Sequence, residues 1–324
     1  MPQDPVAGVA ALDDLAKRGS ARAASKLAFY TLRGIGRPKD TDEAIRLYRH
    51  AVDLGSDRTL LSLAKVLASE KRYDEAADAL TTAQARDVKG ARVAWLEASA
   101  LSRLGTHSDP DSAWQDLQIL AQQADPIAER AALYVAWKRR AAIPNDAPVI
   151  ARHRALAMDG DAKAAERLVR YLRTRTSGQG SYLTLRAELL ALPGIRPAVR
   201  AEEALHVARL REASTFWQAA ERIVSSVDED SYARALFVTS RINKNAYVAI
   251  LQRDLETLGY TPGEATGYLN IETLRAVYRF CDDRTIQKAC VPGPAKSSTI
   301  RIVSRELAEA LVEGGHFDRL HTDG

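Results

Sequence analysis

The sequence lacks the residue patterns from which most catalytic and metal sites are built. None of its six histidines occurs in the H-E-x-x-H spacing or in a comparable metal-binding spacing. It contains neither a glycine-rich phosphate loop nor the Gly-x-Ser-x-Gly turn that presents a serine nucleophile. Its many carboxylates form no pair that differs from ordinary charge on a helix surface. These absences predict a protein that is not an enzyme and that requires no cofactor or metal.

Long apolar runs are also absent. The longest, such as residues 131–137, are far shorter than the ~20 residues that a helix needs to cross a bilayer. The start of the chain, Met1 to Pro5, has neither the basic nor the apolar stretch of an export signal. The sequence therefore predicts no transmembrane segment and no export signal, and it leaves both an envelope and a cytoplasmic location open.

Cysteine is rare, and both cysteines, Cys281 and Cys290, lie in the last quarter of the chain. Their C-x8-C spacing does not match a zinc-binding pair, which would need a shorter spacing and a second pair. A single disulfide in an exported protein explains an even count with local spacing. Two buried free thiols explain it equally well, so the sequence leaves both alternatives open.

Neither positive nor negative charge is in large excess in the chain. The 46 Lys and Arg residues are balanced by 42 Asp and Glu residues, and the net charge of +4 argues against a nucleic-acid partner. Arg outnumbers Lys 35 to 11. A GC-rich coding sequence explains this bias, and so does an arginine surface that binds acidic groups in a bidentate manner.

Helix-forming residues are what the sequence has in abundance. Ala, Leu, Arg and Glu fill long stretches, while aromatic residues account for only 6%. The predicted fold class is all-α, with roughly 65–75% helix, well above the average for globular proteins.

A helix junction recurs along the chain, beginning at Gly19, Gly55 and Gly160. In each copy a Leu follows the glycine by eight residues, and a Tyr or Val follows it by eleven. The glycine is typical of a left-handed helix end, and the Ser or Asp after it is typical of an N-cap. Small alanines between these positions let two helices approach closely. The pattern predicts stacked helical hairpins, none of which can bury its apolar face alone.

The clearest repeat covers residues 21–55. Small and apolar positions on a first helix are followed by a Gly-x-Gly turn, an Asp, and a second helix with Glu-Ala, an aromatic residue and a small pair. The motif is carried by Ala24, Leu27, Ala28, Tyr30, Gly34, Gly36, Asp40, Glu43, Ala44, Tyr48, Ala51 and Val52. It resembles a Sel1-like repeat of the Sel1/TPR type. The resemblance implies an α-solenoid that binds a protein partner in an extended groove.

Later repeats are more degenerate. Residues 73–83 read like the second helix of a TPR hairpin, and Gly105, Pro110, Pro126 and Pro144 separate further helical stretches. The predicted Sel1/TPR-like solenoid domain covers residues 1–242.

The last quarter of the chain, residues 243–324, shows a different pattern. It begins with a predicted helix that contains Val-x-x-Leu-Gln and ends at Leu-Gly-Tyr. A second predicted helix follows, with the motif Thr-x-x-Ala-Val-x-x-Phe. The pattern is carried by Val248, Leu251, Gln252, Leu258, Gly259, Tyr260, Thr273, Ala276, Val277 and Phe280. It resembles the type-1 peptidoglycan-binding family, which implies a small helical domain. Family resemblance also singles out Tyr260, Tyr268, Asn270 and Thr273 for glycan contact.

This segment departs from the family in its loop. Ala265-Thr266-Gly267 replaces the usual Asp-Gly before the aromatic residue. Asn270 stands where the family has a second loop glycine, and asparagine tolerates a positive φ angle well.

Together the resemblances imply a non-enzymatic scaffold of the bacterial cell envelope. Its repeats would bind a protein partner, and its terminal domain would contact peptidoglycan or another polysaccharide. Analogy at the level of the fold suggests roles in exopolysaccharide export or cell-pole organisation. The alternative is a cytoplasmic adaptor or regulator whose terminal domain is only a structural cap. A cell-wall hydrolase is disfavoured because helical repeats account for the rest of the chain.

Overall fold

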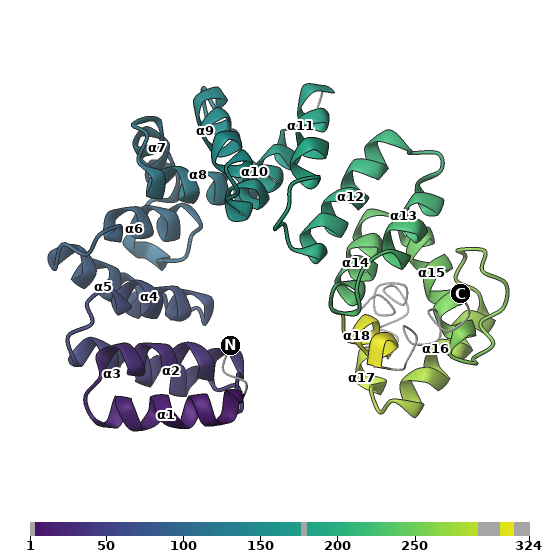
Figure 1. Cartoon of the computed structure of the whole chain (residues 1–324), viewed down its shortest axis with the longest axis horizontal. Coiled ribbons are helices and arrows are strands. Elements are labelled where there is room, and N and C mark those ends of the chain that lie inside the picture. The colour runs from purple at the N-terminus through teal and green to yellow at the C-terminus, as the bar shows by residue number, and fades with distance from the viewer. Residues whose placement is uncertain (1–3, 176–179, 291–304, 314–324) are drawn as a thin grey trace. The chain divides into compact units, whose positions relative to one another are not determined.

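The computed structural model describes residues 4–175, 180–290 and 305–313, and every regular element in these ranges is a helix (Figure 1). Helices make up 74% of the residues that the structure describes. This confirms the all-α fold class and agrees with a solenoid of helical hairpins. In the part of the chain that the structure describes, no helix is both long enough and apolar enough to cross a membrane.

The chain divides into two compact units. Unit 1 comprises residues 1–153 and 173–175, and unit 2 comprises residues 154–172 and 176–324. Both α9 (Ala147–Met158) and α10 (Ala162–Thr174) contribute residues to each unit.

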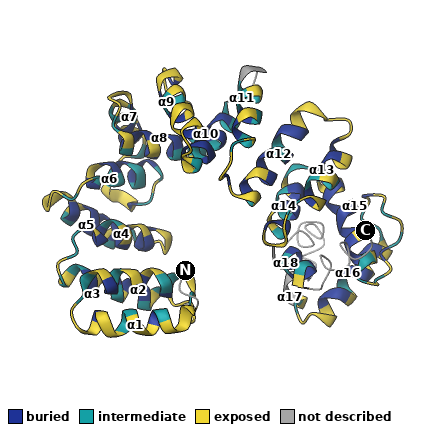
Figure 2. Cartoon of the chain, viewed as in Figure 1, coloured by how far each residue is buried: buried dark blue, intermediate teal, exposed yellow. Residues whose placement is uncertain are grey.

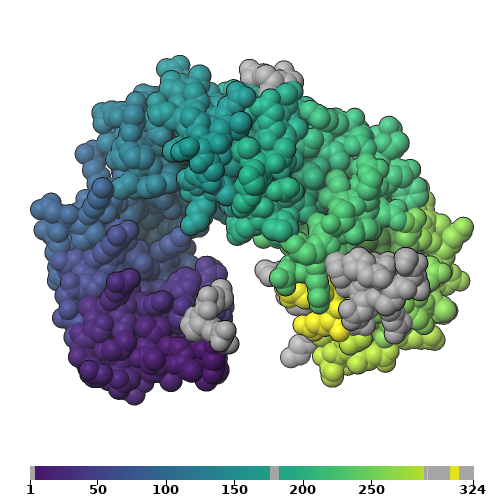
Figure 3. All heavy atoms as spheres, viewed as in Figure 1, coloured from purple at the N-terminus to yellow at the C-terminus, as the bar shows by residue number. Residues whose placement is uncertain are grey.

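Unit 1 is a succession of helical hairpins. Its helices are α1 (Pro5–Lys17), α2 (Ala21–Arg33), α3 (Thr41–Asp53), α4 (Thr59–Ser69), α5 (Tyr73–Ala85), α6 (Ala91–Ala100), the short 3-10 helix η1 (Gly105–His107), α7 (Pro110–Gln122) and α8 (Pro126–Arg139). The first helices of successive hairpins are neighbours, because α4 contacts α6 and α6 contacts α8. In Figure 2 the buried residues, in dark blue, alternate with exposed residues along each helix, and in Figure 3 atoms fill the spaces between neighbouring helices.

The α2–α3 hairpin shows how the repeat motif specifies this fold. Leu27 and Tyr48 are 0% and 4% exposed, so the motif's apolar positions form the contact between helices. Asp40 caps α3 by accepting a hydrogen bond from the backbone N–H of Glu43 at 2.9 Å. Gly36 has a φ angle of +69°, and a Cβ there would clash with the carbonyl group of Pro5. Glycine is therefore required at the second position of the Gly-x-Gly turn.

Left-handed residues end most helices of unit 1. The glycines of the recurring junction, Gly19 and Gly55, have φ angles of +89° and +94°, which confirms their predicted role as helix ends. Further along, the equivalent left-handed residues are not glycines and have φ angles between 50° and 62°. These residues are Lys71, Asp87, Ser102, Ala124 and Arg140. The later hairpins thus keep the geometry of the junction without its glycine signal.

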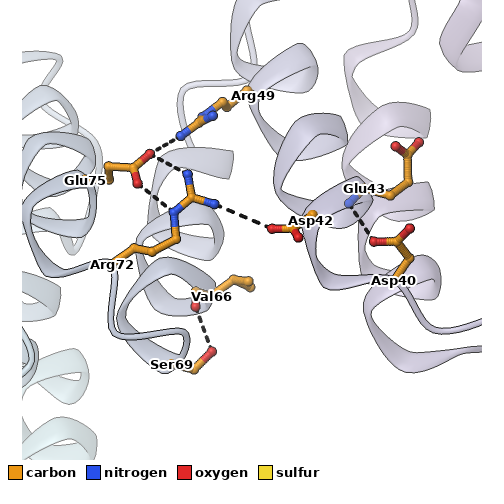
Figure 4. A network of polar contacts seen from close by, with 8 residues as sticks. All are labelled: Asp40, Asp42, Glu43, Arg49, Val66, Ser69, Arg72 and Glu75. Atoms are coloured by element: carbon orange, nitrogen blue, oxygen red, sulfur yellow. Dashed lines mark hydrogen bonds and ion pairs between the residues drawn. The ribbon is translucent and has the colours of Figure 1, made fainter.

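An arginine–carboxylate network joins the second helices of the first two repeats, α3 and α5 (Figure 4). Arg72 donates from Nε and Nη2 to the two carboxylate oxygens of Glu75 at 2.6 and 2.8 Å. Arg49 also donates to Glu75, and Arg72 lies 3.7 Å from Asp42 at the start of α3. Because these side chains are partly exposed, the network orients the two helices more than it stabilises them.

Unit 2 contains the remaining helices. They are α11 (Gly180–Leu190), α12 (Pro197–Arg211), α13 (Phe216–Ser225), α14 (Glu229–Ile242), α15 (Lys244–Thr257), α16 (Ile271–Asp283), α17 (Gln287–Cys290) and α18 (Arg305–Glu313). One hydrophobic cluster runs from Ala201 in α12 to Leu311 in α18. The expected domain boundary between residues 242 and 243 falls between α14 and α15, both of which contribute to this cluster. The terminal module therefore packs against the helices before it, and its separate identity stays a prediction.

Candidate functional site

Three adjoining hollows along unit 1 form one continuous surface, here called the groove. The first, of about 520 Å³, is lined by α2, Tyr48 of α3 and the start of α4. The second, of about 670 Å³, shares Arg58 with the first and reaches the turn after α5 and the start of α8. The third, of about 430 Å³, shares Lys89 and Ile127 with the second and extends onto α6. The groove thus follows the first helices of four successive hairpins.

Basic side chains outnumber acidic side chains in the groove by seven to three. Two of the carboxylates already have partners: Asp57 accepts from Arg86 at 2.5 Å, and Asp125 caps α8 by accepting from the N–H of Ile127 at 2.7 Å. Five cations of the first two hollows have no carboxylate within ion-pair distance among the described residues. They are Arg22, Lys26, Arg58, Lys89 and Arg130. The groove is therefore markedly basic in a chain whose net charge is only +4.

Aromatic side chains supply an apolar surface at the α2 end of the groove. Phe29 is 44% exposed, and its ring centroid lies 5.9 Å from that of Tyr30. The ammonium group of Lys26 lies 5.8 Å from the centroid of the Tyr30 ring. Burial raises the pKa of Tyr48, while nearby Arg33 opposes that rise, so the Tyr48 hydroxyl stays protonated near neutral pH. An exposed ring beside free cations can bind a chain that carries both apolar and acidic groups.

The cations of the groove were not singled out by the sequence analysis, although a signal for them exists. Arg22 and Arg58 each stand three residues after a junction glycine, and Lys163 repeats this position in the third copy. A cation thus stands at the start of the first helix or directly before it in all three copies. Only the packing of the hairpins shows that Arg22 and Arg58 line one surface.

The residues expected to contact glycan occupy very different environments in the terminal module. Thr273 is 0% exposed, and its hydroxyl donates to the Pro262 carbonyl or the Asn270 side chain, both 2.9 Å away. Asn270 caps α16 by accepting from the N–H of Thr273 at 2.7 Å. Its φ angle is −105°, so the expected positive φ is wrong: the side chain caps a helix, which requires extended backbone. Both residues hold the loop before α16 in place.

Gln252 explains why the motif places a Gln in the first helix of the module. Its side chain is 0% exposed, and its Nε2 donates to the hydroxyl of Thr273 at 2.8 Å and to the Tyr268 carbonyl at 3.1 Å. Its Oε1 accepts from the N–H of Gly267 at 3.0 Å. A buried amide with all these partners fixes the loop against α15 and satisfies its own polar atoms.

The two tyrosines of the expected glycan set differ in exposure. The hydroxyl of Tyr260 donates to Asp283 at 2.7 Å, and its ring packs edge-on against Phe280 with centroids 5.6 Å apart. Tyr268 is 71% exposed, and its neighbour Ile271 is 64% exposed. Of the four expected residues, Tyr268 is the one whose ring is free to lie against a ligand.

The structure joins Cys281 of α16 and Cys290 of α17 in a disulfide. Both residues are 1% exposed, and their Cα atoms are 6.3 Å apart. The bond ties the short α17 to the end of α16 inside the hydrophobic cluster of unit 2.

A carboxyl group is buried where α14 and α15 pack together. Asp254 is 3% exposed and accepts a hydrogen bond from the hydroxyl of Tyr232 at 2.7 Å. Burial raises the pKa of Asp254 to about 7, and the hydrogen bond from Tyr232 limits that rise. Burial and the nearby carboxyl group also raise the pKa of Tyr247. Tyr232 is 2% exposed as well, so this cluster lies within the core of unit 2 and contributes to its stability.

Within residues 4–175, 180–290 and 305–313, no group of three His, Cys, Asp or Glu side chains could hold a metal ion. The chain has no significant match among protein-family models, curated proteins or solved structures.

Proposed function

We propose that the chain is a non-enzymatic scaffold of the Sel1/TPR type that binds a protein partner in the groove of unit 1. The observation that carries the proposal is the groove itself, which combines free cations with the exposed ring of Phe29. Stacked helical hairpins provide such extended surfaces for proteins or peptides. Arginine and aromatic side chains are also enriched in protein interfaces.

Photo-crosslinking from within the groove tests this proposal. A benzophenone amino acid replaces Phe29 in the full chain, expressed in the cells of origin. The matched control places it at Lys39, an exposed residue in the α2–α3 loop that does not line the groove. We expect a discrete crosslinked protein from position 29 and none of that mass from position 39. Equal crosslinking from both positions, or none from either, contradicts a partner-binding groove.

We place the scaffold in the bacterial cell envelope, with roles in exopolysaccharide export or cell-pole organisation as the candidates. The disulfide between Cys281 and Cys290 supports this placement, because disulfides persist in oxidising compartments. Thiol alkylation in intact cells, followed by mass spectrometry, measures whether the bond exists there. Two alkylated thiols would favour a cytoplasmic adaptor instead.

The terminal module has two candidate roles. The exposed pair Tyr268 and Ile271 supports contact with peptidoglycan or another polysaccharide, because sugars stack on exposed rings. The hydrophobic cluster shared by α12 to α18 favours the second role, a structural cap. Co-sedimentation with peptidoglycan sacculi separates them. If the module binds the cell wall, the wild-type protein sediments with the sacculi and Tyr268→Ala does not. If the module is only a cap, neither protein sediments. A point substitution suits this test, since deleting residues 243–324 would expose the buried face of α14.

A further inference from the structure

We infer that the groove of unit 1 takes an extended, acidic segment of a protein, with an aromatic or leucine side chain between its carboxylates. The inference rests on the proposed function, because it specifies the partner of the same surface. It is drawn from the charge, length and apolar content of the groove.

Charge complementarity points to an acidic ligand. Arg22, Lys26, Arg58, Lys89 and Arg130 all line the groove and have no carboxylate within ion-pair distance among the described residues. Their side chains are exposed, so a bound carboxylate does not first have to displace an internal partner. Complementary charge at an interface raises the association rate and rejects partners of the wrong sign. A basic or neutral segment gains nothing from these five groups.

The arrangement of the cations points to an extended ligand. They come from α2, the turn before α4, the turn before α6, and α8. Direct contacts make the first helices of these hairpins successive neighbours: Thr59 donates to Ser25 at 3.2 Å, α4 contacts α6, and α6 contacts α8. Packed helices lie about 8–10 Å apart, so the cations span roughly 25–30 Å. An extended chain of about eight or nine residues covers that distance.

The aromatic end of the groove points to an apolar anchor. Phe29 is 44% exposed and lines the same hollow as Arg22, Lys26 and Arg58. A peptide side chain packed on this ring would remove apolar surface from water next to the charged contacts. The anchor therefore belongs within the acidic stretch.

A compact polyanion fits the groove less well than a peptide. The central hollow gathers Arg58, Lys89 and Arg130, but it also contains the carboxylates Asp57 and Asp125. A dense cluster of phosphates would meet these carboxylates at short range. It would also leave the surface of Phe29 unused. A flexible chain can place its carboxylates beside the cations and turn neutral backbone toward Asp57 and Asp125.

Fluorescence anisotropy with defined peptides tests the inference on the full chain. The probe is a fluorescein-labelled peptide of about nine residues that alternates glutamate with leucine and one central phenylalanine. Two comparison peptides replace every glutamate by glutamine or by lysine, and inorganic tripolyphosphate serves as the compact polyanion. We expect the acidic peptide to bind at least about tenfold more tightly than the glutamine peptide, with an affinity that falls as salt increases.

Paired charge reversals locate the binding. The groove variant is Arg58→Glu with Lys89→Glu, in the turns that precede α4 and α6. The matched control is Lys39→Glu with Lys71→Glu, in the α2–α3 and α4–α5 loops, which do not line the groove. Both change the net charge equally, and circular dichroism verifies that both keep their helix content. We expect at least about a tenfold loss of affinity for the groove variant and less than about a twofold loss for the control.

Several results would contradict the inference, and they differ in what they imply for the proposed scaffold function. Equal binding of the glutamine and acidic peptides, or equal losses in both paired variants, overturns the acidic class of partner. Displacement of the probe by tripolyphosphate, together with unchanged binding in Phe29→Ala, identifies a polyanion site and also overturns the inference. Absence of peptide binding does the same, yet a crosslinked partner from position 29 would leave the proposed scaffold function intact.

Discussion

Arg86, in the turn after α5, donates from Nη1 to the Oδ1 of Asp57 in the turn before α4, at a distance of 2.5 Å. The pair joins the start of α4 to the end of α5 within one hairpin of unit 1, and it neutralises one cation of the central hollow. Arg58, adjacent to Asp57 in the chain, has no such partner among the described residues. Internal pairing thus separates the cations that hold the hairpins together from those that face a ligand.

Removing the charge of Asp57 should strengthen the binding of acidic peptides. Asp57→Asn releases Arg86 from its ion pair and adds one free cation to the central hollow. We expect affinity for the acidic probe to rise about two- to threefold, as measured by anisotropy at low salt. The control is Asp42→Asn, at the opposite end of α3. A rise of the same size in the control would mean that the gain reflects net charge rather than the groove.

Arg186 and Glu203 form an ion pair within unit 2 in which both side chains are 0% exposed. Arg186→Ala leaves the Glu203 carboxylate buried without its guanidinium and should lower the free energy of unfolding by about 3–5 kcal/mol. Replacing both groups by apolar residues, Arg186→Met with Glu203→Leu, removes that buried charge. Urea denaturation should find this double variant more stable than Arg186→Ala. A double variant as unstable as Arg186→Ala would contradict this explanation.

Ala124 adopts a left-handed conformation at the end of α7, with a φ angle of 62°. This conformation is strained for alanine and free for glycine, so Ala124→Gly should raise the free energy of unfolding by about 0.5–1 kcal/mol. The exposed Ala11 within α1 provides the matched control, where the same substitution should cost about 1 kcal/mol. Thermal unfolding measures both. A loss at both positions would show that the left-handed conformation carries no strain.

The buried Asp254 should make the stability of unit 2 depend on pH. Its folded pKa of about 7 lies above the ordinary value of 3.8, so folding favours the protonated form. The stability that this provides is complete at low pH and is lost as the pH rises toward 7. Asp254→Asn does not titrate and should gain on the order of 2 kcal/mol relative to the wild type between pH 5 and pH 8.

Urea denaturation across this pH range measures the difference. The exposed Asp230→Asn in the first turn of α14 is the control, and its difference from the wild type should stay constant. A constant difference for Asp254→Asn as well would mean that the carboxyl group ionises freely in the folded state.

The helix ends of the first hairpins could be predicted because residues typical of helix ends and helix caps occur there in the sequence. Gly34 and Asp40 mark the end of α2 and the start of α3. The end of α7 at Ala124 could not be located this way, since an alanine takes the left-handed conformation only when the surrounding packing imposes it.

Side-chain roles in the terminal module were harder to predict than its helices. A family motif marks Tyr268 and Thr273 as equally important, yet one is 71% exposed and the other 0% exposed. Asn270 precedes Thr273 by three residues. An N-cap side chain accepts from the backbone N–H of the residue three positions later, so a capping role could have been predicted. The groove could not have been predicted, because its cations are brought together only by the packing of the hairpins against one another.

The central claim is that the free cations of the groove recruit the native partner. The most direct test measures the yield of partner crosslinked from position 29 in three backgrounds: wild type, Arg58→Glu with Lys89→Glu, and Lys39→Glu with Lys71→Glu. We expect the first pair of substitutions to abolish the crosslink at unchanged protein level and the second pair to preserve it. Equal yields in all three backgrounds would contradict the central claim.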